Sequence, residues 1–216
     1  KTTLAEHVAE ALGAALVSVA CSEETSPRHF FGRRGLSEYE PSAFLAAYEA
    51  QTPTVLLIDE IDALLPSVGV ALNAALANGR FGLPERPAAP IATRGPEVVV
   101  VAAANTYGTG PSALYCGRNA LDAATLDRWA YVSVGYDAAL EERIASSYGA
   151  QRVLEALRRT RAGIDAHSLR RVASTRTLLR LAGRIATGAA ADEPATLRAE
   201  FAARGWSEAE LVKVGL

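Results

Sequence analysis

The sequence predicts an α/β fold with a parallel sheet, followed by a smaller all-helical domain. Every residue of two runs, 54–58 and 98–104, is apolar or β-branched, which is typical of parallel strands that are covered on both faces. Helical patterns separate these runs, and after Asp137 only helical patterns follow. We therefore expect an α/β domain over residues 1–136 and a helical domain over residues 137–216.

Composition narrows the class of protein. Half of the 216 residues are hydrophobic and the net charge is −2, which predicts a globular chain without a general attraction to nucleic acid. The two cysteines, Cys21 and Cys116, are too far apart in sequence for a zinc knuckle and form no disulfide framework. The sequence has neither a membrane-length apolar run nor a signal-peptide pattern. We expect a cytoplasmic protein with reduced thiols and no membrane partner.

The first elements are a helix and a strand. Apolar residues at Leu4, Val8 and Leu12 recur with a helical period, and Gly13 suits the position after a helix end. Residues 16–19 are then predicted to form a short strand. A helix followed by a parallel strand is the usual beginning of a doubly wound sheet.

Residues 22–41 interrupt this pattern with an aromatic and basic cluster. Phe30, Phe31, Arg33 and Arg34 lie between turn residues, and a helix from Ser42 to about residue 50 follows. One alternative is an exposed loop that contacts a partner or substrate. The other is that the phenylalanines belong to the core and the arginines to a solvated face.

The middle of the chain is predicted to contain a helix and a projecting hairpin. Pro66 suits the beginning of an amphipathic helix that ends near Gly79. Residues 80–96 are rich in proline and glycine, which predicts a hairpin or long loop. Such length inside a compact domain favours a functional role.

The last part of the chain is predicted to be mostly helical. Asp122 suits the N-cap of a helix over Ala123–Trp129, and a strand over Tyr131–Val134 follows. Ser207 begins a capping box for the last short helix. The other helical patterns cover residues 138–147, 151–161, 167–172, 175–185 and 196–203.

Chemistry is expected where the run 54–58 ends in Asp59 and Glu60. Ligands of open α/β sheets bind beyond the carboxyl ends of the strands. There Asp59 can hold Mg²⁺, and Glu60 can orient or deprotonate a water that attacks a γ-phosphate, as in a Walker B motif. The alternative is a buried strand whose acids cap the next helix.

The beginning of the chain favours the nucleotide interpretation. Lys1-Thr2-Thr3 leads into a helix and has the form of the end of GxxxxGK followed by Ser or Thr, although the glycines are absent. In that motif the lysine reaches the β- and γ-phosphates and the hydroxyl ligates Mg²⁺. Lys1, Thr2 and Thr3 are therefore candidate ATP-binding residues, and Thr2 and Asp59 are candidate Mg²⁺ ligands.

Three further polar residues are candidates for this site. Asn105 follows the run 98–104 and can hold the attacking water or the γ-phosphate, unless it only closes an Asx-turn. Arg128 faces outward and suits an arginine finger for a neighbouring subunit, or else a salt bridge with Asp127 or Glu141. Arg176 begins a helix of the second domain, from which a lid can aim it at the phosphates.

Taken in order, these residues resemble an AAA+ ATPase. The motifs that carry the resemblance are Lys1-Thr2 for the end of Walker A, Leu56–Glu60 for Walker B, Asn105 for sensor 1, Arg128 for the arginine finger and Arg176 for sensor 2. The resemblance implies a P-loop NTPase αβα sandwich with sheet order 5-1-4-3-2 and a helical lid. It also implies ATP and Mg²⁺ as cofactors and a homo-oligomeric ring, expected to be a hexamer. The first strand and the Walker A glycines would lie upstream of Lys1, so we expect the native chain to extend upstream.

Within that superfamily, the runs 104–110, 114–115 and 126–129 resemble the ATPase subunit of aerobic cobaltochelatase and its MoxR-like relatives. This resemblance implies that Arg28–Leu36 is a helix-2 insert and that Arg80–Pro96 is the hairpin before sensor 1. Both would face the pore of the ring. It also implies a protein substrate or a von Willebrand-type partner subunit.

Three functions are compatible with these patterns. The first is an ATPase that remodels a protein partner, as the motor of a metal-chelatase or MoxR-type complex. The second is a motor that moves along nucleic acid, with Arg28, Arg33, Arg34 and Arg80 on the phosphates, although the acidic net charge argues against it. The third is a regulatory subunit that binds nucleotide without hydrolysis, which the full set of acidic, amide and guanidinium groups disfavours.

Overall fold

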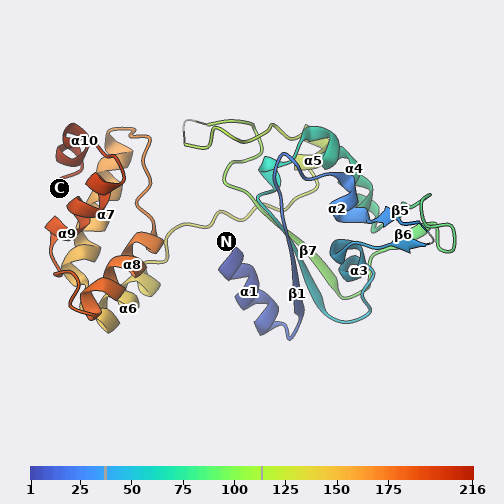
Figure 1. Cartoon of the computed structure of the whole chain (residues 1–216), viewed down its shortest axis with the longest axis horizontal. Coiled ribbons are helices and arrows are strands. Elements are labelled where there is room, and N and C mark those ends of the chain that lie inside the picture. The colour runs from blue at the N-terminus through green and yellow to red at the C-terminus, as the bar shows by residue number, and fades with distance from the viewer. Residues whose placement is uncertain (37, 113) are drawn as a thin grey trace. The chain divides into compact units, whose positions relative to one another are not determined.

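The computed structural model describes residues 1–36, 38–112 and 114–216, and these form two compact units, Lys1–Val132 and Ser133–Leu216. The first unit mixes helices and strands, and the second is helical (Figure 1). The elements of the first unit are α1 (Thr2–Ala11), β1 (Ala15–Ala20), α2 (Pro27–Phe31), β2 (Arg33–Arg34), β3 (Tyr39–Glu40), α3 (Ala43–Tyr48), β4 (Thr54–Asp59), the 3₁₀ turn η1 (Ile61–Ala63), α4 (Pro66–Asn78), β5 (Arg80–Gly82), β6 (Ile91–Thr93), β7 (Val98–Ala103) and α5 (Ala123–Leu126). The elements of the second unit are α6 (Ala138–Tyr148), α7 (Gln151–Ala166), α8 (Thr175–Ala186), α9 (Pro194–Ala203) and α10 (Glu208–Lys213).

A parallel sheet in the order β1-β4-β7 forms the centre of the first unit (Figure 1). β4 pairs with both neighbours over its whole length, from Thr54 to Asp59. Residues 54–58 are buried because they have a strand on each side and side chains covered on both faces. The predicted α/β fold with a parallel sheet is thus confirmed. Three strands do not test the predicted five-strand order.

Helices cover both faces of this sheet. On one face α1 contacts β1 and β4, and its small residue Ala5 packs with Leu57 and Ala103. On the other face α3 packs against β1 and β4, and its Phe44 and Tyr48 belong to the main core. The Tyr48 hydroxyl donates to the carbonyl of Ala75 at 2.7 Å, which ties α3 to α4. These layers fix the strands, and therefore the ends of the strands, relative to one another.

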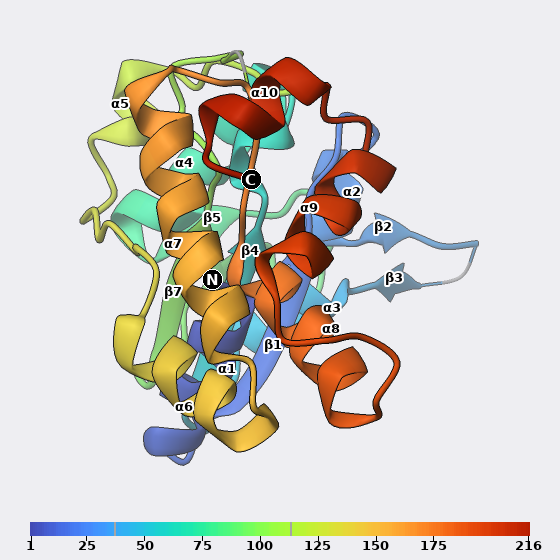
Figure 2. The ribbon, with the colours of Figure 1, turned by 90° about the vertical axis from the view of Figure 1, so that its left-hand side faces the viewer.

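The segment between β1 and α3 forms the short helix α2 and the hairpin β2-β3, which projects from the first unit (Figure 2). Phe30 is fully buried, and Phe31 packs on Phe81 with 4.8 Å between ring centroids. The interpretation of the phenylalanines as core residues is therefore correct. Arg33 is exposed and pairs with Glu40. Gly32 is required because its φ is 88° and a Cβ there would lie 2.3 Å from the carbonyl oxygen of Glu40.

The predicted hairpin over residues 80–96 is present. β5 and β6 are antiparallel, with Arg80 opposite Thr93. The connecting loop is fixed by Arg86, which donates to both carboxylate oxygens of Glu49 at 2.6 and 2.8 Å. A bidentate pair of this kind holds the loop against the end of α3.

Three predicted elements differ in the structure. Tyr131–Val134 is not a strand, and Val132 is 82% exposed. The described sheet consists of β1, β4 and β7, and none of these strands pairs with this segment. The helix after Asp122 ends at Leu126 and not at Trp129. Residues 167–172 are not helical, because α7 continues to Ala166 and Ser168 then takes a left-handed φ of 48°.

The helices of the second unit pack around their own apolar core. Leu154, Leu178 and Phe201 are fully buried there, and Trp206 stacks on Phe201 with 4.3 Å between ring centroids. The capping box that begins at Ser207 is present, because the Glu210 carboxylate accepts from the Ser207 N–H at 2.8 Å. Hydrogen bonds from Arg171 and Ser207 hold the pKa of Glu210 at about 2. Among the described residues, no helix is both long and apolar enough to cross a membrane.

A buried ion pair lies inside the second unit. Arg161 donates to both oxygens of Glu141 at 2.7 and 2.8 Å, and Thr175 donates to the same carboxylate at 2.6 Å. The ring of Tyr136 covers the guanidinium at 3.6 Å. Burial acts to raise the pKa of Glu141, but the hydrogen bonds from Arg161 and Thr175 outweigh it and lower the pKa below its ordinary value.

Replacing this buried carboxylate is expected to destabilise the second unit. Glu141→Gln leaves the guanidinium of Arg161 without its counter-ion, which costs about 3 kcal/mol of unfolding free energy. The matched control is Glu142→Gln, because Glu142 pairs with Arg158 at an exposed site, where the cost is about 0.5 kcal/mol or less. Urea unfolding followed by the fluorescence of Trp206, in a Trp129→Phe background, measures both values.

The effect of Glu141→Gln is also expected to depend on pH. The folded-state pKa lies below the ordinary value of 4.5, so the carboxylate stabilises the fold fully above that pH. Its contribution is lost as the pH falls through the folded-state pKa. The difference in unfolding free energy between wild type and Glu141→Gln should therefore shrink in acid. Equal losses for Glu141→Gln and Glu142→Gln at pH 7 would contradict the role given to the buried ion pair.

Candidate active site

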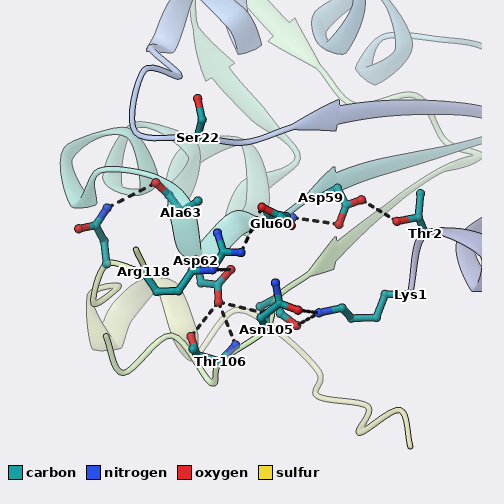
Figure 3. A network of polar contacts seen from close by, with 12 residues as sticks. Lys1, Thr2, Ser22, Asp59, Glu60, Asp62, Ala63, Asn105, Thr106 and Arg118 are labelled. Atoms are coloured by element: carbon teal, nitrogen blue, oxygen red, sulfur yellow. Dashed lines mark hydrogen bonds and ion pairs between the residues drawn. The ribbon is translucent and has the colours of Figure 1, made fainter. Parts of the chain in front are cut away.

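The carboxyl ends of the three parallel strands bring separate segments together. β1 ends at Ala20, β4 at Asp59 and β7 at Ala103, and Asp59 is in register with both of the others. The segments that follow these strands therefore begin at one edge of the sheet. The beginning of α1 lies at the same edge, as the contacts of its first residues show (Figure 3).

Asp59 is held between α1 and the backbone that follows β4. The Thr2 hydroxyl donates to Asp59 Oδ2 at 2.7 Å, and the Glu60 N–H donates to Asp59 Oδ1 at 3.0 Å. Asp59 is half-buried. The hydroxyl of Thr2 and the carboxylate of Asp59 thus present adjacent oxygens, which is the type of ligand that Mg²⁺ prefers.

Lys1 reaches across to the end of β7. Its Nζ donates to Asn105 Oδ1 and to the carbonyl of Ala104 (Figure 3). Partial removal from water lowers the pKa of the Lys1 side chain, and the carboxylates of Asp62, Asp59 and Glu60 act in the opposite direction. The amide oxygen of Asn105 therefore accepts a hydrogen bond from the Lys1 ammonium group at this edge of the sheet.

Glu60 has an unusual backbone conformation. Its φ and ψ are 56° and 40°, in the left-handed region that residues with a Cβ seldom occupy. The turn η1 follows at once, and the Ala63 N–H donates to the Glu60 carbonyl at 2.8 Å. The carboxylate is directed to Arg118 Nη2, at 3.1 Å, instead of capping this turn. The Glu60 side chain therefore does not cap the helical turn that follows β4.

Asp62 is the buried centre of the site. Its side chain is fully buried, and Oδ2 accepts hydrogen bonds from the Asn105 N–H at 3.0 Å and from the Thr106 N–H and hydroxyl at 2.9 Å each. Oδ1 lies 3.7 Å from Arg118 Nε. This single carboxylate fixes the segment that carries Asn105 against the turn after β4 (Figure 3).

Sequence reasoning gave no role to Asp62, Thr106 or Arg118. A signal for Asp62 does exist, because it is a lone acid within the apolar run Ile61–Leu65. An acid in such a run must be satisfied by donors from elsewhere in the fold. Nothing in the sequence identifies those donors, since Thr106 and Arg118 are more than 40 residues away.

The acids give this edge of the sheet a negative potential. Burial raises the pKa of Cys21, the first residue after β1, to about 12, and the charges of Asp59, Glu60 and Asp62 contribute to the rise. A cation is stabilised by the same charges. Among the described residues, no group of three or more His, Cys, Asp or Glu side chains is arranged to hold a metal ion. A cation that keeps waters and shares phosphate ligands, as Mg²⁺ does, fits the adjacent oxygens of Thr2 and Asp59.

Thr3 and Arg128 lie outside this network, and Arg176 belongs to the second unit. Thr3 is exposed on α1. Arg128 is exposed, and its guanidinium donates to the carbonyl of Ala124 in α5 and not to Asp127 or Glu141. Arg176 is exposed at the beginning of α8 in the second unit. The structure therefore brings together Lys1, Thr2, Asp59, Glu60 and Asn105.

Comparison with known proteins defines the class first and then the family. The family model described as AAA domain (dynein-related subfamily) matches residues 1–129, which is more than half of the chain. The chain therefore belongs to the AAA+ class, in which nucleotide binding, usually with Mg²⁺, is typical. Within that class it belongs to the AAA domain family of the dynein-related subfamily.

Two other comparisons add little detail. No curated protein matches the chain. A solved structure from Cytophaga hutchinsonii, named a "putative ATPase", is similar to it with a TM-score of 0.47 and 14% sequence identity. The similarity covers 69% of this chain and 42% of that protein, so the chain spans less than half the length of that structure.

The hydroxyl of Thr106 is expected to contribute to the stability of the first unit. Thr106→Val removes its hydrogen bond to the buried carboxylate of Asp62, and also the bond that Gly108 N–H donates to it at 3.2 Å. A hydrogen bond to a charged group contributes about 1.5–3 kcal/mol, and we expect a loss of about 2 kcal/mol. Urea unfolding followed by the fluorescence of Trp129, in a Trp206→Phe background, measures it. The control is Thr109→Val at an exposed position, and an equal loss there would contradict the role of the Asp62 contact.

Proposed function

We propose that this protein is a ring-forming AAA+ ATPase that uses ATP hydrolysis to remodel a protein partner. One observation supports the proposal most directly. The Thr2 hydroxyl contacts Asp59, and Lys1 contacts Asn105, although 57 and 104 positions of sequence separate the two pairs. Together with the family match, this juxtaposition supports a Walker-type site at the carboxyl edge of the sheet.

In this proposal each residue at the strand ends has one task. Bound Mg·ATP supplies the polarised γ-phosphate. Thr2 and Asp59 hold the ion through their oxygens, and Lys1 neutralises phosphate charge. Glu60 orients the attacking water and accepts its proton, while the Asn105 amide holds the water or the γ-phosphate. Thr3 contacts the nucleotide from the first turn of α1.

Two arginines complete the proposed site from outside this cluster. Arg128 is exposed, which suits an arginine finger that reaches the γ-phosphate of a neighbouring protomer in a ring, expected to be a hexamer. Arg176, at the exposed beginning of α8, acts as sensor 2 from a helical lid. Both guanidiniums offer a planar set of donors that matches phosphate oxygens.

The proposed place within the superfamily is the MoxR-like group that includes the cobaltochelatase motor. It is supported by the two hairpins of the first unit. The α2-β2-β3 segment, which contains Arg28–Leu36, lies where a helix-2 insert is expected, and β5-β6 precedes β7. In this proposal both hairpins face the pore of the ring, and the partner is a protein substrate or a von Willebrand-type subunit.

Replacing the proposed catalytic carboxylate is expected to separate binding from turnover. In the full-length protein, Glu60→Gln keeps the shape of the side chain but removes the base, so kcat should fall by about 10²–10⁴-fold. The Kd for ATP should change by less than about threefold. Hydrolysis by phosphate release and binding by titration calorimetry measure the two quantities, and wild-type kcat would refute the proposed role.

The same variant also tests the class of partner. Glu60→Gln held in ATP should accumulate the engaged state, so that its partner co-purifies with it. A metal-binding von Willebrand-type protein would support the chelatase or MoxR-like assignment. Nucleic acid in place of protein would instead favour a translocating motor and contradict the proposal.

The trans role of Arg128 is tested by mixing variants. Arg128→Ala should lower kcat by about 10³-fold because one guanidinium that stabilises the transition state is lost, while monomer affinity for ATP is kept. Mixed rings of Arg128→Ala and Glu60→Gln subunits should regain part of the activity, since some interfaces then combine an intact glutamate with an intact arginine. Phosphate release measured across mixing ratios checks this, and activity that never exceeds the sum of the separate variants would exclude action in trans.

A further inference from the structure

Arg118 is a nearly buried arginine to which the proposed mechanism gives no task. It lies on the long segment between β7 and α5, yet its side chain is only 14% exposed. Its Nη2 donates to Glu60 Oε2 at 3.1 Å, and its Nε lies 3.7 Å from Asp62 Oδ1. One guanidinium thus spans the carboxylates of two residues on the same turn (Figure 3).

The position of Arg118 is set by contacts that do not involve Glu60. The N–H of the next residue, Asn119, donates to the Asp62 carbonyl at 2.8 Å, and its side-chain amide donates to the Ala63 carbonyl at 3.4 Å. Ala120 forms a β-bridge with Thr109. The backbone beside Arg118 is therefore tied to η1 from one side and to the beginning of its own loop from the other.

Asp62 supplies the electrostatic anchor. Its carboxylate is fully buried, and three hydrogen bonds all end on Oδ2. Oδ1 accepts no hydrogen bond from the described residues and lies 3.7 Å from Arg118 Nε. A buried carboxylate is costly unless a cation compensates it. The charge of Asp62 therefore holds the Arg118 guanidinium in place. Arg118 in turn binds the carboxylate of Glu60, whose side chain is 49% exposed.

We propose that Arg118 is a positioning residue for Glu60. This inference rests on the proposed function, in which Glu60 orients the attacking water. The contact engages Oε2 and so assigns Oε1 to the water. The same contact selects one rotamer of the Glu60 side chain. This side chain is half-exposed and leaves a left-handed backbone, so several rotamers would otherwise be open to it.

The same arrangement links Glu60 to Asn105. Asp62 binds the Asn105 N–H through Oδ2 and faces Arg118 through Oδ1, so one buried side chain sets the position of both. The water held by the proposed sensor amide and the carboxylate that accepts its proton then share a common anchor. Alignment of reacting groups within a fraction of an ångström is a large part of enzymatic rate acceleration.

The geometry favours positioning over direct contact with phosphate. The Arg118 guanidinium already faces two carboxylates, Glu60 through Nη2 and Asp62 through Nε, so its charge is compensated within the protein. Arg128, in contrast, is exposed and bonded only to a carbonyl within the described residues. The two arginines therefore have different tasks.

The test is Arg118→Lys in the full-length protein. A lysine keeps the positive charge beside Asp62, but a single ammonium cannot span both carboxylates. We expect kcat to fall about tenfold, with KM and the Kd of a non-hydrolysable ATP analogue unchanged within about twofold. The control is Arg171→Lys, which breaks a bidentate pair with Glu210 in the second unit and should leave kcat unchanged.

A double-variant cycle distinguishes action through Glu60 from an independent effect. In a Glu60→Gln background, Arg118→Lys should not change the single-turnover rate further, because the residue through which it acts is already disabled. Arg118→Gln, a neutral donor, gives the same comparison if the lysine variant does not fold. Folding of each variant is checked by urea unfolding before the kinetics are compared.

The outcomes separate this inference from the proposed function. Wild-type turnover in Glu60→Gln would overturn the proposed function and the inference with it. An inactive Glu60→Gln together with wild-type kcat in Arg118→Lys would overturn the inference alone. A weaker Kd at unchanged kcat, a raised kcat, or a further tenfold loss in the Glu60→Gln background would each also overturn it.

Discussion

The fully buried carboxylate of Asp62 is the interaction on which the candidate site depends. It accepts three hydrogen bonds from Asn105 and Thr106 and faces the guanidinium of Arg118. Without these donors an ionised group inside the core would be strongly unfavourable. The burial of one charge therefore forces two distant segments, the beginning and the end of the loop after β7, to converge on the turn after β4.

That turn also carries the strained residue of the first unit. Glu60 has a left-handed conformation between a buried strand and a 3₁₀ turn. Because the chain turns sharply there, the carboxylates of Asp59 and Asp62 bind different partners. Asp59 faces the Thr2 hydroxyl on one side, and Asp62 faces the loop after β7 on the other. The cost of the left-handed backbone is offset by strand pairing before it and by the buried contacts of Ile61 and Leu64 after it.

Both units use the same solution for a buried acid. In the first, Asp62 is compensated by Arg118 and by backbone donors, and in the second, Glu141 is compensated by Arg161 and the Thr175 hydroxyl. In each case the arginine also contacts a second group, Glu60 in one unit and Tyr136 in the other. A planar guanidinium suits this bridging task because its donors point in several fixed directions.

Sequence patterns alone predicted the parallel α/β sheet, the helix after Pro66, the hairpin over residues 80–96 and the AAA+ class. Buried strands lack polar alternation, and acids at a strand end mark the edge where ligands bind, so short-range patterns suffice for these features. Contacts between segments distant in sequence were needed to show that Tyr131–Val134 is not a strand, that Phe30 is a core residue, and that Asp62, Thr106 and Arg118 form one network. A strand needs a neighbour to pair with and a buried charge needs donors, and both are supplied by residues distant in sequence, which no local pattern identifies.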